Sequence, residues 1–259
     1  MIAKWKKHLS HYFYSIFEYL FIIFGHKFTV TYRKMGGEFH FKDFEDLVKL
    51  DSSIVIEIGA NDGESTEEIL KYFPKSKVFA FEPDKRAVEE FKKRFRGDNR
   101  VELAKILVTE EMDNHKIDFF PSDKNTFVKS NEINWHYSGS YLRPHTHLVR
   151  HPTINFSETI KVDRTTLDSW YSTKNLELIN LIWMDTQGAE YKILTGATQI
   201  LSSTLYIFME YSLFELYRGQ KTLKSTLKLL PGWRVLKLYP HDVLLENIKL
   251  HERIEGGQI

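Results

Sequence analysis

The chain has 259 residues, of which 42% are hydrophobic and 27% charged, and its formal net charge is +1. This length and composition fit one α/β domain with its own core. The balanced charge gives no basic footprint for nucleic acid as a main partner. The chain contains no cysteine, which excludes disulfides, thiolate metal sites and a cysteine nucleophile. We therefore expect a globular protein of a reducing compartment such as the cytoplasm.

An aromatic and apolar run follows three lysines within residues 4–24. Glu18 interrupts this run, no small-residue cleavage site follows it, and it is shorter than the roughly 20 residues that a membrane-spanning helix needs. We expect a helix that packs on the domain or on a second subunit, with peripheral membrane contact and a true span as alternatives. Together with a helix expected at residues 39–50, it would form an N-terminal helical extension over residues 1–50.

Strands and helices are predicted to alternate from residue 54 onwards. Residues 54–58 form a short apolar run that is typical of a buried parallel strand. A helix follows, with a capping box in which Ser65 caps and Glu68 reaches back. The next expected elements are a strand at 78–81, a helix after Pro83 and a strand at 101–108. This β-α-β-α-β order predicts a doubly wound sheet.

Residues 114–155 break the alternation, because they are rich in His, Ser, Asn, Thr and Tyr and have few long apolar runs. A long polar insertion in a regular α/β domain is usually functional. The alternation then resumes within the domain predicted for residues 51–259. Its further expected elements are strands at 159–162, 178–185 and 205–211, helices at 165–171, 189–201 (with a break at Gly196) and 222–230, and a closing hairpin of 234–239 with 243–250.

The turn after the first strand, EIGANDG at residues 57–63, lies where open α/β sheets bind ligands. Gly59 and Gly63 let a ligand approach the backbone closely. A dinucleotide-binding turn would need Gly-x-Gly-x-x-Gly to admit a pyrophosphate, but Asn61 stands at the second glycine and the third is missing. Glu57 also disfavours a phosphate and would suit the positively charged amino acid part of S-adenosylmethionine (SAM). The alternative is a turn with a structural role only.

Polar residues also follow two further predicted strands. Glu82 stands after the second strand, at about the 20-residue spacing expected for an acidic partner of a ribose. It could accept hydrogen bonds from both ribose hydroxyls, or it could be a solvated charge. Asp185, Gln187 and Glu190 follow the most apolar strand and would face the same cleft. Their alternative role is to stabilise the N-terminus of a helix.

Four segments, VIEIGANDG, FAFEP, VDRTTLDSW and LIWMDTQGAEYKILTGA, together resemble the FkbM family of SAM-dependent methyltransferases over residues 54–250. The resemblance implies a Rossmann-like class I methyltransferase, with a seven-stranded and mostly parallel sheet whose last strand is antiparallel. It implies SAM as cofactor and methyl transfer to oxygen, often on a sugar hydroxyl of a glycan or natural product. The resemblance places Glu57, Gly59, Asn61 and Gly63 around SAM and Glu82 on its ribose. Asp185, Gln187 and Glu190 match a later motif of the family, and we expect Asp185 and Gln187 to bind SAM as well.

The acceptor would be a small molecule or a glycan, and a hydroxyl acceptor calls for a general base. Asp185 stands at the right strand end for this role, and His136, His145 and His147 of the polar insertion are further candidates. Metal assistance is an alternative, but the histidine spacing matches no zinc pattern, so we predict no metal site. The residues expected to bind the acceptor are Ser140, Tyr141, Gln187, Glu190 and Glu210.

Three rival functions remain open at this point. One is transfer to nitrogen, or to a protein or lipid, by an enzyme of the same fold. The second is a nicotinamide-dependent oxidoreductase, which the missing third glycine disfavours. The third is an inactive binding module with no affinity for SAM.

Overall fold

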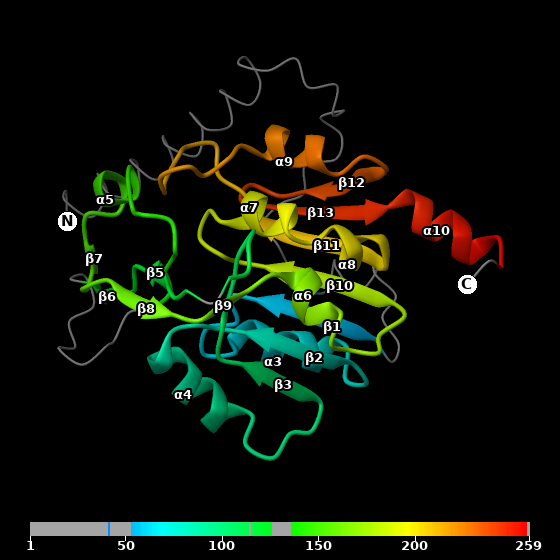
Figure 1. Ribbon diagram of the computed structural model, residues 1–259, viewed down its shortest axis with the longest axis horizontal. Helices are drawn as coiled ribbons and strands as arrows, with labels where there is room; N and C mark the ends of the chain where they lie inside the picture. The colour runs from blue at the N-terminus through cyan, green and yellow to red at the C-terminus, as the bar shows by residue number, and fades with distance from the viewer. Residues whose placement is uncertain (1–40, 42–52, 114, 126–135, 258–259) are drawn as a thin grey trace, which may run out of the picture. The chain divides into compact units, whose positions relative to one another are not determined.

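The computed structural model describes residues 41, 53–113, 115–125 and 136–257 (Figure 1). The expected helix within residues 4–24 lies outside the described residues, as do residues 39–50 except Phe41, which is helical and stacks on Trp183 at 5.2 Å. The chain divides into the units Met1–Met35 and Gly36–Ile259, and every described residue belongs to the second. Among the described residues, no helix has the length and apolar character to cross a membrane.

A seven-stranded sheet with the strand order β12-β13-β11-β10-β1-β2-β3 forms the centre of this unit (Figure 1). Only β13, the last strand in the chain, runs antiparallel to both of its neighbours. The predicted sheet, mostly parallel with a reversed last strand, is therefore confirmed. Its strands are β1 (Ile54–Ile58), β2 (Lys77–Phe81), β3 (Val101–Ala104), β10 (Ile179–Met184), β11 (Thr204–Glu210), β12 (Trp233–Leu238) and β13 (Asp242–Asn247).

Helices pack on both faces of the sheet, so the central strands are buried on both sides. On one face, Ile69 and Leu70 of α3 (Glu64–Tyr72) join a core cluster with Leu181 of β10. On the other face, Trp170 of α6 (Leu167–Tyr171) packs edge-on against Phe79 and Phe81 at 5.1 and 5.2 Å. This second face is the one in front in Figure 1, where α6 crosses the sheet.

The start of α3 differs from the prediction. Gly63, with a φ of 90°, is the residue at which the helix begins, and no side chain caps it. Ser65 therefore lies inside the helix, and Glu68 accepts a bond from Lys71 at 3.0 Å instead of reaching back. The capping box was wrong because a left-handed glycine, not a side chain, starts this helix. In contrast, α4 (Lys85–Arg94) begins as predicted after Pro83, with Asp84 as its cap.

The third predicted strand is also wrong in part, because residues 101–108 divide into two strands. The first half is β3, whereas β4 (Leu107–Val108) leaves the sheet and pairs with β9 (Arg164–Thr165). The predicted strand at 159–162 is β8 (Ile160–Val162), which also lies outside the main sheet. β4 and β8 each pair with a strand more than 40 residues away in the chain. The pattern of apolar residues within one segment does not predict such a pairing.

The polar segment 114–155 contains short regular elements in its described part. β5 (Ile117–Phe119) pairs with β8, and β6 (Ser122–Asn125) pairs with β7 (Ile154–Phe156), both antiparallel. A single turn of helix, α5 (His147–Arg150), lies between them in the chain. The segment is therefore less irregular than predicted.

The last third of the chain confirms one predicted break and corrects one boundary. Gly196 separates α7 (Glu190–Thr195) from α8 (Thr198–Ser202), and a Cβ there would lie 2.6 Å from the Glu110 carbonyl oxygen. α9 (Leu223–Leu229) lies where a helix was predicted. The second hairpin strand ends at Asn247, whose side chain accepts a bond from Leu250 N and caps α10 (Ile248–Glu255). Residues 248–250 are therefore helical, and the sequence analysis missed α10.

Gly59 stands at the closest approach of two strand ends. Its φ is 82°, and a Cβ there would lie 1.9 Å from the carbonyl oxygen of Asp185. We expect Gly59→Ala to lower the free energy of unfolding by about 3 kcal/mol or more, because a backbone clash adds to the left-handed strain. Gly97→Ala is the matched control, since Gly97 has a φ of 83° with nothing within 4 Å. Urea unfolding measures both, and equal losses of stability would contradict the close approach.

Candidate active site

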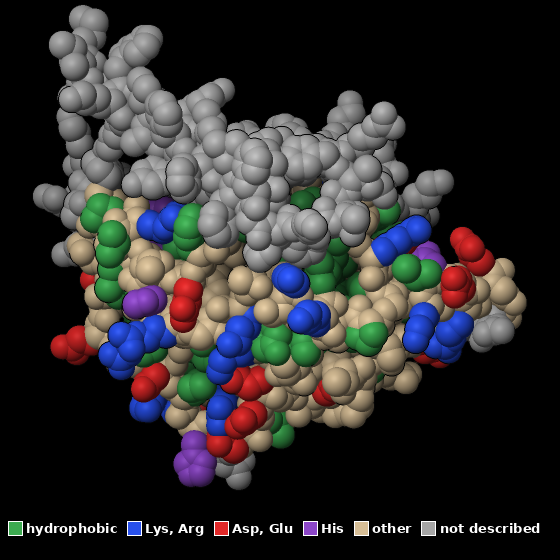
Figure 2. Space-filling view, turned by 90° about the horizontal axis from the view of Figure 1, so that it is seen from above, with side chains coloured by type: hydrophobic (Ala, Val, Ile, Leu, Met, Phe, Trp, Pro, Cys, Tyr) green, Lys and Arg blue, Asp and Glu red, His purple; other side chains and the backbone are tan. Residues whose placement is uncertain are grey.

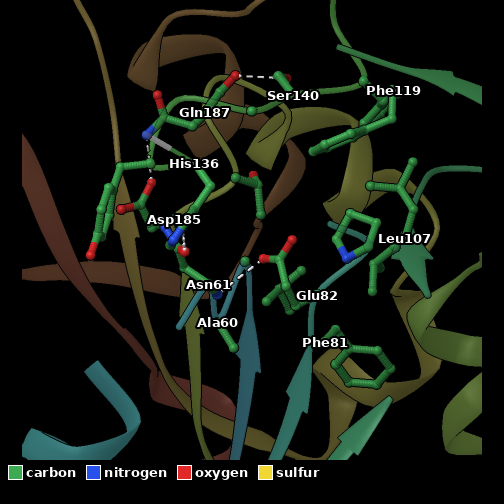
Figure 3. A pocket seen from close by; sticks show the side chains of 18 of the residues that line it. Ala60, Asn61, Phe81, Glu82, Leu107, Phe119, His136, Ser140, Asp185 and Gln187 are labelled. Carbon is green, nitrogen blue, oxygen red and sulfur yellow. Dashed lines mark hydrogen bonds between the residues drawn. The ribbon is translucent and has the colours of Figure 1, made fainter. Parts of the chain in front are cut away.

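A cavity of about 250 Å³ opens at the carboxyl ends of β1, β2 and β10 (Figure 3). Its lining comes from three strand ends, namely residues 58–62, Glu82 with Pro83, and residues 185–187. Further lining residues come from the segments 106–108 and 136–141 and from Glu64, Ser65, Phe81, Phe119 and Ile193. Open α/β sheets bind ligands at this edge, so the cavity is the candidate site.

Glu82 is held rigidly at the wall of the cavity. Its Oε2 accepts a bond from Asn61 N at 3.0 Å, and its Oε1 accepts one from Asp84 N at 2.7 Å. Figure 3 shows the bond from Asn61 and the Glu82 carboxyl group at the cavity. Burial raises the pKa of this group to about 7. Each carboxylate oxygen has two acceptor sites, so the group can still accept two hydroxyl donors from a ligand.

Of the four residues in the turn after β1 that were predicted to bind SAM, two line the cavity and two do not. Gly59 and Asn61 line the cavity, and Asn61 has the left-handed φ of 50°. Glu57 and Gly63 are not among the lining residues. Glu57 is buried and accepts a bond from the Thr66 hydroxyl, and burial raises its pKa to about 8. Gly63 instead makes room for a ring, because a Cβ there would lie 2.5 Å from Phe95.

Asp185 faces the cavity from the end of β10. It accepts a bond from Gln187 Nε2 at 2.8 Å and makes a hydrogen bond with the carboxyl of Glu210. Removal from bulk water raises the pKa of both groups. The charge of Asp185 and the hydrogen bond between the two carboxyls raise the pKa of Glu210 further.

Gln187 ties this acid pair to the rest of the site. Its φ is 53°, a left-handed conformation that is unusual for a residue other than glycine. Its Nε2 also donates to Glu210 at 3.3 Å, and its Oε1 accepts a bond from the Tyr217 hydroxyl at 2.9 Å. Its carbonyl oxygen accepts a bond from Ser140 Oγ at 3.0 Å. The strained loop therefore places the Gln187 side chain as a bridge between the acid pair and Tyr217.

The three candidate histidines lie in different places. His136 is buried, lines the cavity, bonds Asn61 Oδ1 through Nδ1, and has Nε2 3.4 Å from Glu90. His145 is exposed and lies outside the cavity lining. His147 is also outside it, buried against Phe156 and Tyr217, and burial lowers its pKa to about 4. Only His136 is positioned to meet a ligand in this cavity.

The residues expected to bind an acceptor are also divided. Ser140, Tyr141 and Gln187 line the cavity, whereas Glu190 and Glu210 do not. The Glu190 carboxyl accepts bonds from Thr186 N at 3.0 Å, Thr186 Oγ1 at 2.9 Å and Gly188 N at 3.3 Å. Glu190 therefore holds the loop at the start of α7, which was its alternative role. Glu210 reaches the site only through Asp185 and Gln187.

The sequence analysis missed an apolar wall of the cavity. Phe81, Leu107, Val108 and Phe119 line it, and Figure 3 shows Leu107, Phe119 and Phe81 on the side of Glu82. Leu107 and Phe119 belong to β4 and β5, which lie outside the main sheet. Their place at the cavity depends on long-range pairing, and no local signal marks them as functional. Such a wall suits a flat apolar ring next to the hydroxyls that Glu82 would bind.

The charged residues of the cavity lining indicate the sign of the charge that the ligand carries. The lining includes Asp62, Glu64, Glu82 and Asp185, and its described part contains neither lysine nor arginine. A pyrophosphate would find no cation here, whereas a positively charged sulfonium is favoured among these acids. Ribose acceptors on Glu82, an apolar wall and an acidic lining together fit SAM. No group of three or more His, Asp or Glu suited to a metal ion occurs in the described part of the chain.

The fold and this cavity are those of a class I SAM-dependent methyltransferase. The family described as "Methyltransferase FkbM domain" matches residues 57–241. The chain is also 36% identical over 208 residues to "2-O-methyltransferase NoeI" of Sinorhizobium fredii (strain NBRC 101917 / NGR234), a match that covers 79% of this chain and 83% of that protein. The chain therefore belongs to the FkbM methyltransferase family and uses SAM, as the four segments predicted.

Family membership excludes two of the three rival functions. The oxidoreductase and the inactive binding module are both contradicted, because the matching domain is described as a methyltransferase domain and the 36% identical relative is named a methyltransferase. Similar solved structures include an rRNA methylase of Streptococcus thermophilus (15% identity, TM-score 0.41, 80% of this chain and 93% of that one). Another is the Streptococcus mutans protein SMU.1697c in complex with SAH (14% identity, TM-score 0.41, 79% of this chain and 93% of that one). Likeness at this level adds nothing to the family assignment.

We expect Glu82→Ala to weaken SAM binding by about 10- to 100-fold, because a buried ligand would lose a charged acceptor of its hydroxyls. Glu64→Ala is the matched control, since Glu64 lines the same cavity but is exposed. It removes the same charge and should weaken binding by less than about threefold. Calorimetry with SAM measures both variants, and equal losses would show that Glu82 acts only through its charge.

We expect the ligand-free protein to lose stability as the pH rises from about 5 to 8. Burial raises the folded-state pKa values of Glu57 to about 8 and of Glu82, Glu190 and Asp242 to about 7. Over this range the folded state holds protons that the unfolded state has released, so deprotonation favours unfolding. Each unit of pKa shift corresponds to about 1.4 kcal/mol. Denaturant unfolding across this pH range measures the slope.

Glu57→Gln isolates one of these groups, because glutamine resembles the protonated acid in shape and does not titrate. The variant should be more stable than the wild type at pH 8, by several kcal/mol at most, and close to it at pH 5. An unchanged pH slope would contradict a protonated Glu57 in the folded protein.

Proposed function

We propose that the protein transfers the methyl group of SAM to a hydroxyl of a sugar within a glycan or a glycosylated natural product. The observation that carries this proposal is the carboxylate of Asp185 in the cavity, across from Glu82 and paired with Glu210. A relative that covers most of this chain is named a 2-O-methyltransferase, which supports oxygen as the acceptor atom.

SAM brings an activated methyl group when it is bound, so the protein supplies position and proton removal. Glu82 would hold the ribose hydroxyls, and the wall of Phe81, Leu107 and Phe119 would hold the adenine. The acids of the lining would attract the positive charge. In this arrangement Asn61 N and Asp84 N orient Glu82 before any ligand arrives.

Asp185 is the best-placed general base in the described part of the site. Its ordinary pKa would make it a weak base, but removal from bulk water raises the pKa and so strengthens it at neutral pH. Glu210 and Gln187 orient the carboxylate by hydrogen bonds. His136 is the other candidate in the cavity, but both of its ring nitrogens already face partners, Asn61 and Glu90. Ser140 and Tyr141 would shape the acceptor side of the cavity.

We propose the cytoplasm as the site of action, which the lack of cysteine supports. Residues 4–24 would provide peripheral membrane contact or self-association, and the near-neutral net charge argues against nucleic acid as a partner. Sedimentation of the full chain with and without anionic vesicles would separate membrane contact from self-association.

We expect Asp185→Asn to lower kcat by about 100-fold or more while SAM affinity changes by only a few fold, because asparagine keeps the shape but cannot take the proton. Initial rates with radiolabelled SAM and a panel of glycosides measure the effect. His145→Ala is the control and should leave the rate unchanged, since His145 lies outside the cavity.

The same assay tests the acceptor. NMR of the product identifies an O-methyl sugar, and a methylated amine, protein or lipid would instead support the remaining alternatives. Full activity of Asp185→Asn would contradict Asp185 as the base.

A further inference from the structure

A second hollow, which we call the basic groove, lies against the wall of the active-site cavity and has a volume of about 450 Å³. Five of its lining residues are cations and only Asp118 is acidic. The active-site cavity has the opposite character, with acids and neither lysine nor arginine in its described lining. The basic groove is lined by Lys116, Ile117, Asp118, Phe120, Tyr141, Leu142, Arg143, Lys161, Arg164 and Arg218.

Three of the five cations of the basic groove are already paired. Lys161 lies 2.7 Å from Asp118, Lys116 lies 3.5 Å from Asp163, and Arg164 pairs with Asp113. Such pairs are the usual state of surface charges, and in Figure 2 basic and acidic side chains lie next to one another over the described part of the face in view. A paired cation has little need of a further anion.

Arg143 and Arg218 differ from these three. Both are exposed, and within the described ranges neither has a carboxylate partner. The Arg143 guanidinium lies over the Phe120 ring, 5.3 Å from its centre, which holds its aliphatic stem against the groove. Guanidinium groups bind phosphate and carboxylate oxygens in a bidentate manner. These two side chains are therefore available to a ligand anion.

The backbone holds the two arginines side by side. Arg218 N donates to the Arg143 carbonyl oxygen at 2.8 Å, and Pro144 and Tyr217 form a bridge next to them. Tyr217 is fully buried and donates its hydroxyl to Gln187 in the active site. The two segments are thus anchored, and the backbones of Arg143 and Arg218 lie side by side.

The wall between the basic groove and the active-site cavity is thin. Tyr141 lines both hollows. Phe119 and Ser140 line the cavity, while Phe120, the neighbour of Phe119, lines the groove. Phe120 and Ser140 are also joined by a bridge of two backbone bonds, at 2.7 and 3.2 Å. The active-site cavity and the basic groove are therefore adjacent.

We propose that the basic groove binds an anionic substituent, a phosphate or a carboxylate, of the acceptor that is methylated in the adjacent cavity, with Arg143 and Arg218 as its ligands. This inference rests on the proposed methylation of a sugar acceptor. It adds the requirement that this acceptor carries a negatively charged substituent. The separation of acids in the cavity from free arginines in the groove would also orient the acceptor, because its anionic end is repelled from the cavity.

Calorimetry on the full chain tests the groove directly, with inorganic pyrophosphate and a hexuronic acid as separate titrants and a neutral hexose as the blank. The two anions distinguish a phosphate from a carboxylate as the bound group. We expect at least one anion to bind the wild type, and the variant Arg143→Ala/Arg218→Ala to bind it about tenfold more weakly or worse. Arg96→Ala is the matched control, because Arg96 is also exposed and has no ion pair in the described structure.

The titrations are made with and without S-adenosylhomocysteine, whose own affinity is measured in every variant. Unchanged S-adenosylhomocysteine binding shows that the double variant is folded, since its cavity is intact. The proposal that the basic groove binds an anion would be overturned if neither anion bound the wild type, or if Arg96→Ala lost as much anion affinity as the double variant. Failure of the wild type to bind S-adenosylhomocysteine would instead contradict the proposed function. The anion titrations would still show by themselves whether the basic groove binds an anion.

Discussion

The close approach of β1 and β10 at Gly59 and Asp185 is the constraint on which the site depends. Asp185 N donates to the Ile58 carbonyl oxygen at 3.1 Å, and a Cβ at Gly59 would lie 1.9 Å from the Asp185 carbonyl oxygen. Only glycine allows the two strand ends to meet at this distance. Because they meet, the turn that holds Glu82 and the carboxylate of Asp185 face one cavity, so that one ligand can contact both.

The site concentrates acids where water is scarce, which costs stability in the absence of a ligand. Burial raises the pKa of Glu57, Glu82, Glu190 and Glu210. A cationic cofactor relieves this cost when it binds, so binding and folding are coupled. Perturbed acids in a cavity are typical of catalytic sites, and here they also favour a sulfonium over a pyrophosphate.

The sequence located residues of the cavity lining where their position follows from the end of a predicted strand. Gly59, Asn61, Glu82 and Asp185 line the cavity because each stands just after a strand whose apolar run was recognisable. The predictions from sequence failed where a side chain had more than one possible partner. Glu190 holds a loop and His147 packs in the core, because tertiary neighbours compete for the same polar groups.

By itself, the sequence determined the order of the strands of the main sheet, the turn after β1, the acid after β2 and the family, since these depend on residues close together in the chain. Only the tertiary structure decided that Leu107 and Phe119 form a cavity wall, that Glu210 joins Asp185, and that Arg143 and Arg218 lie side by side with no carboxylate partner in the described part of the chain. These contacts join segments tens of residues apart. Their formation depends on which strands pair across the fold, and hydrophobic periodicity along the chain does not predict that pairing.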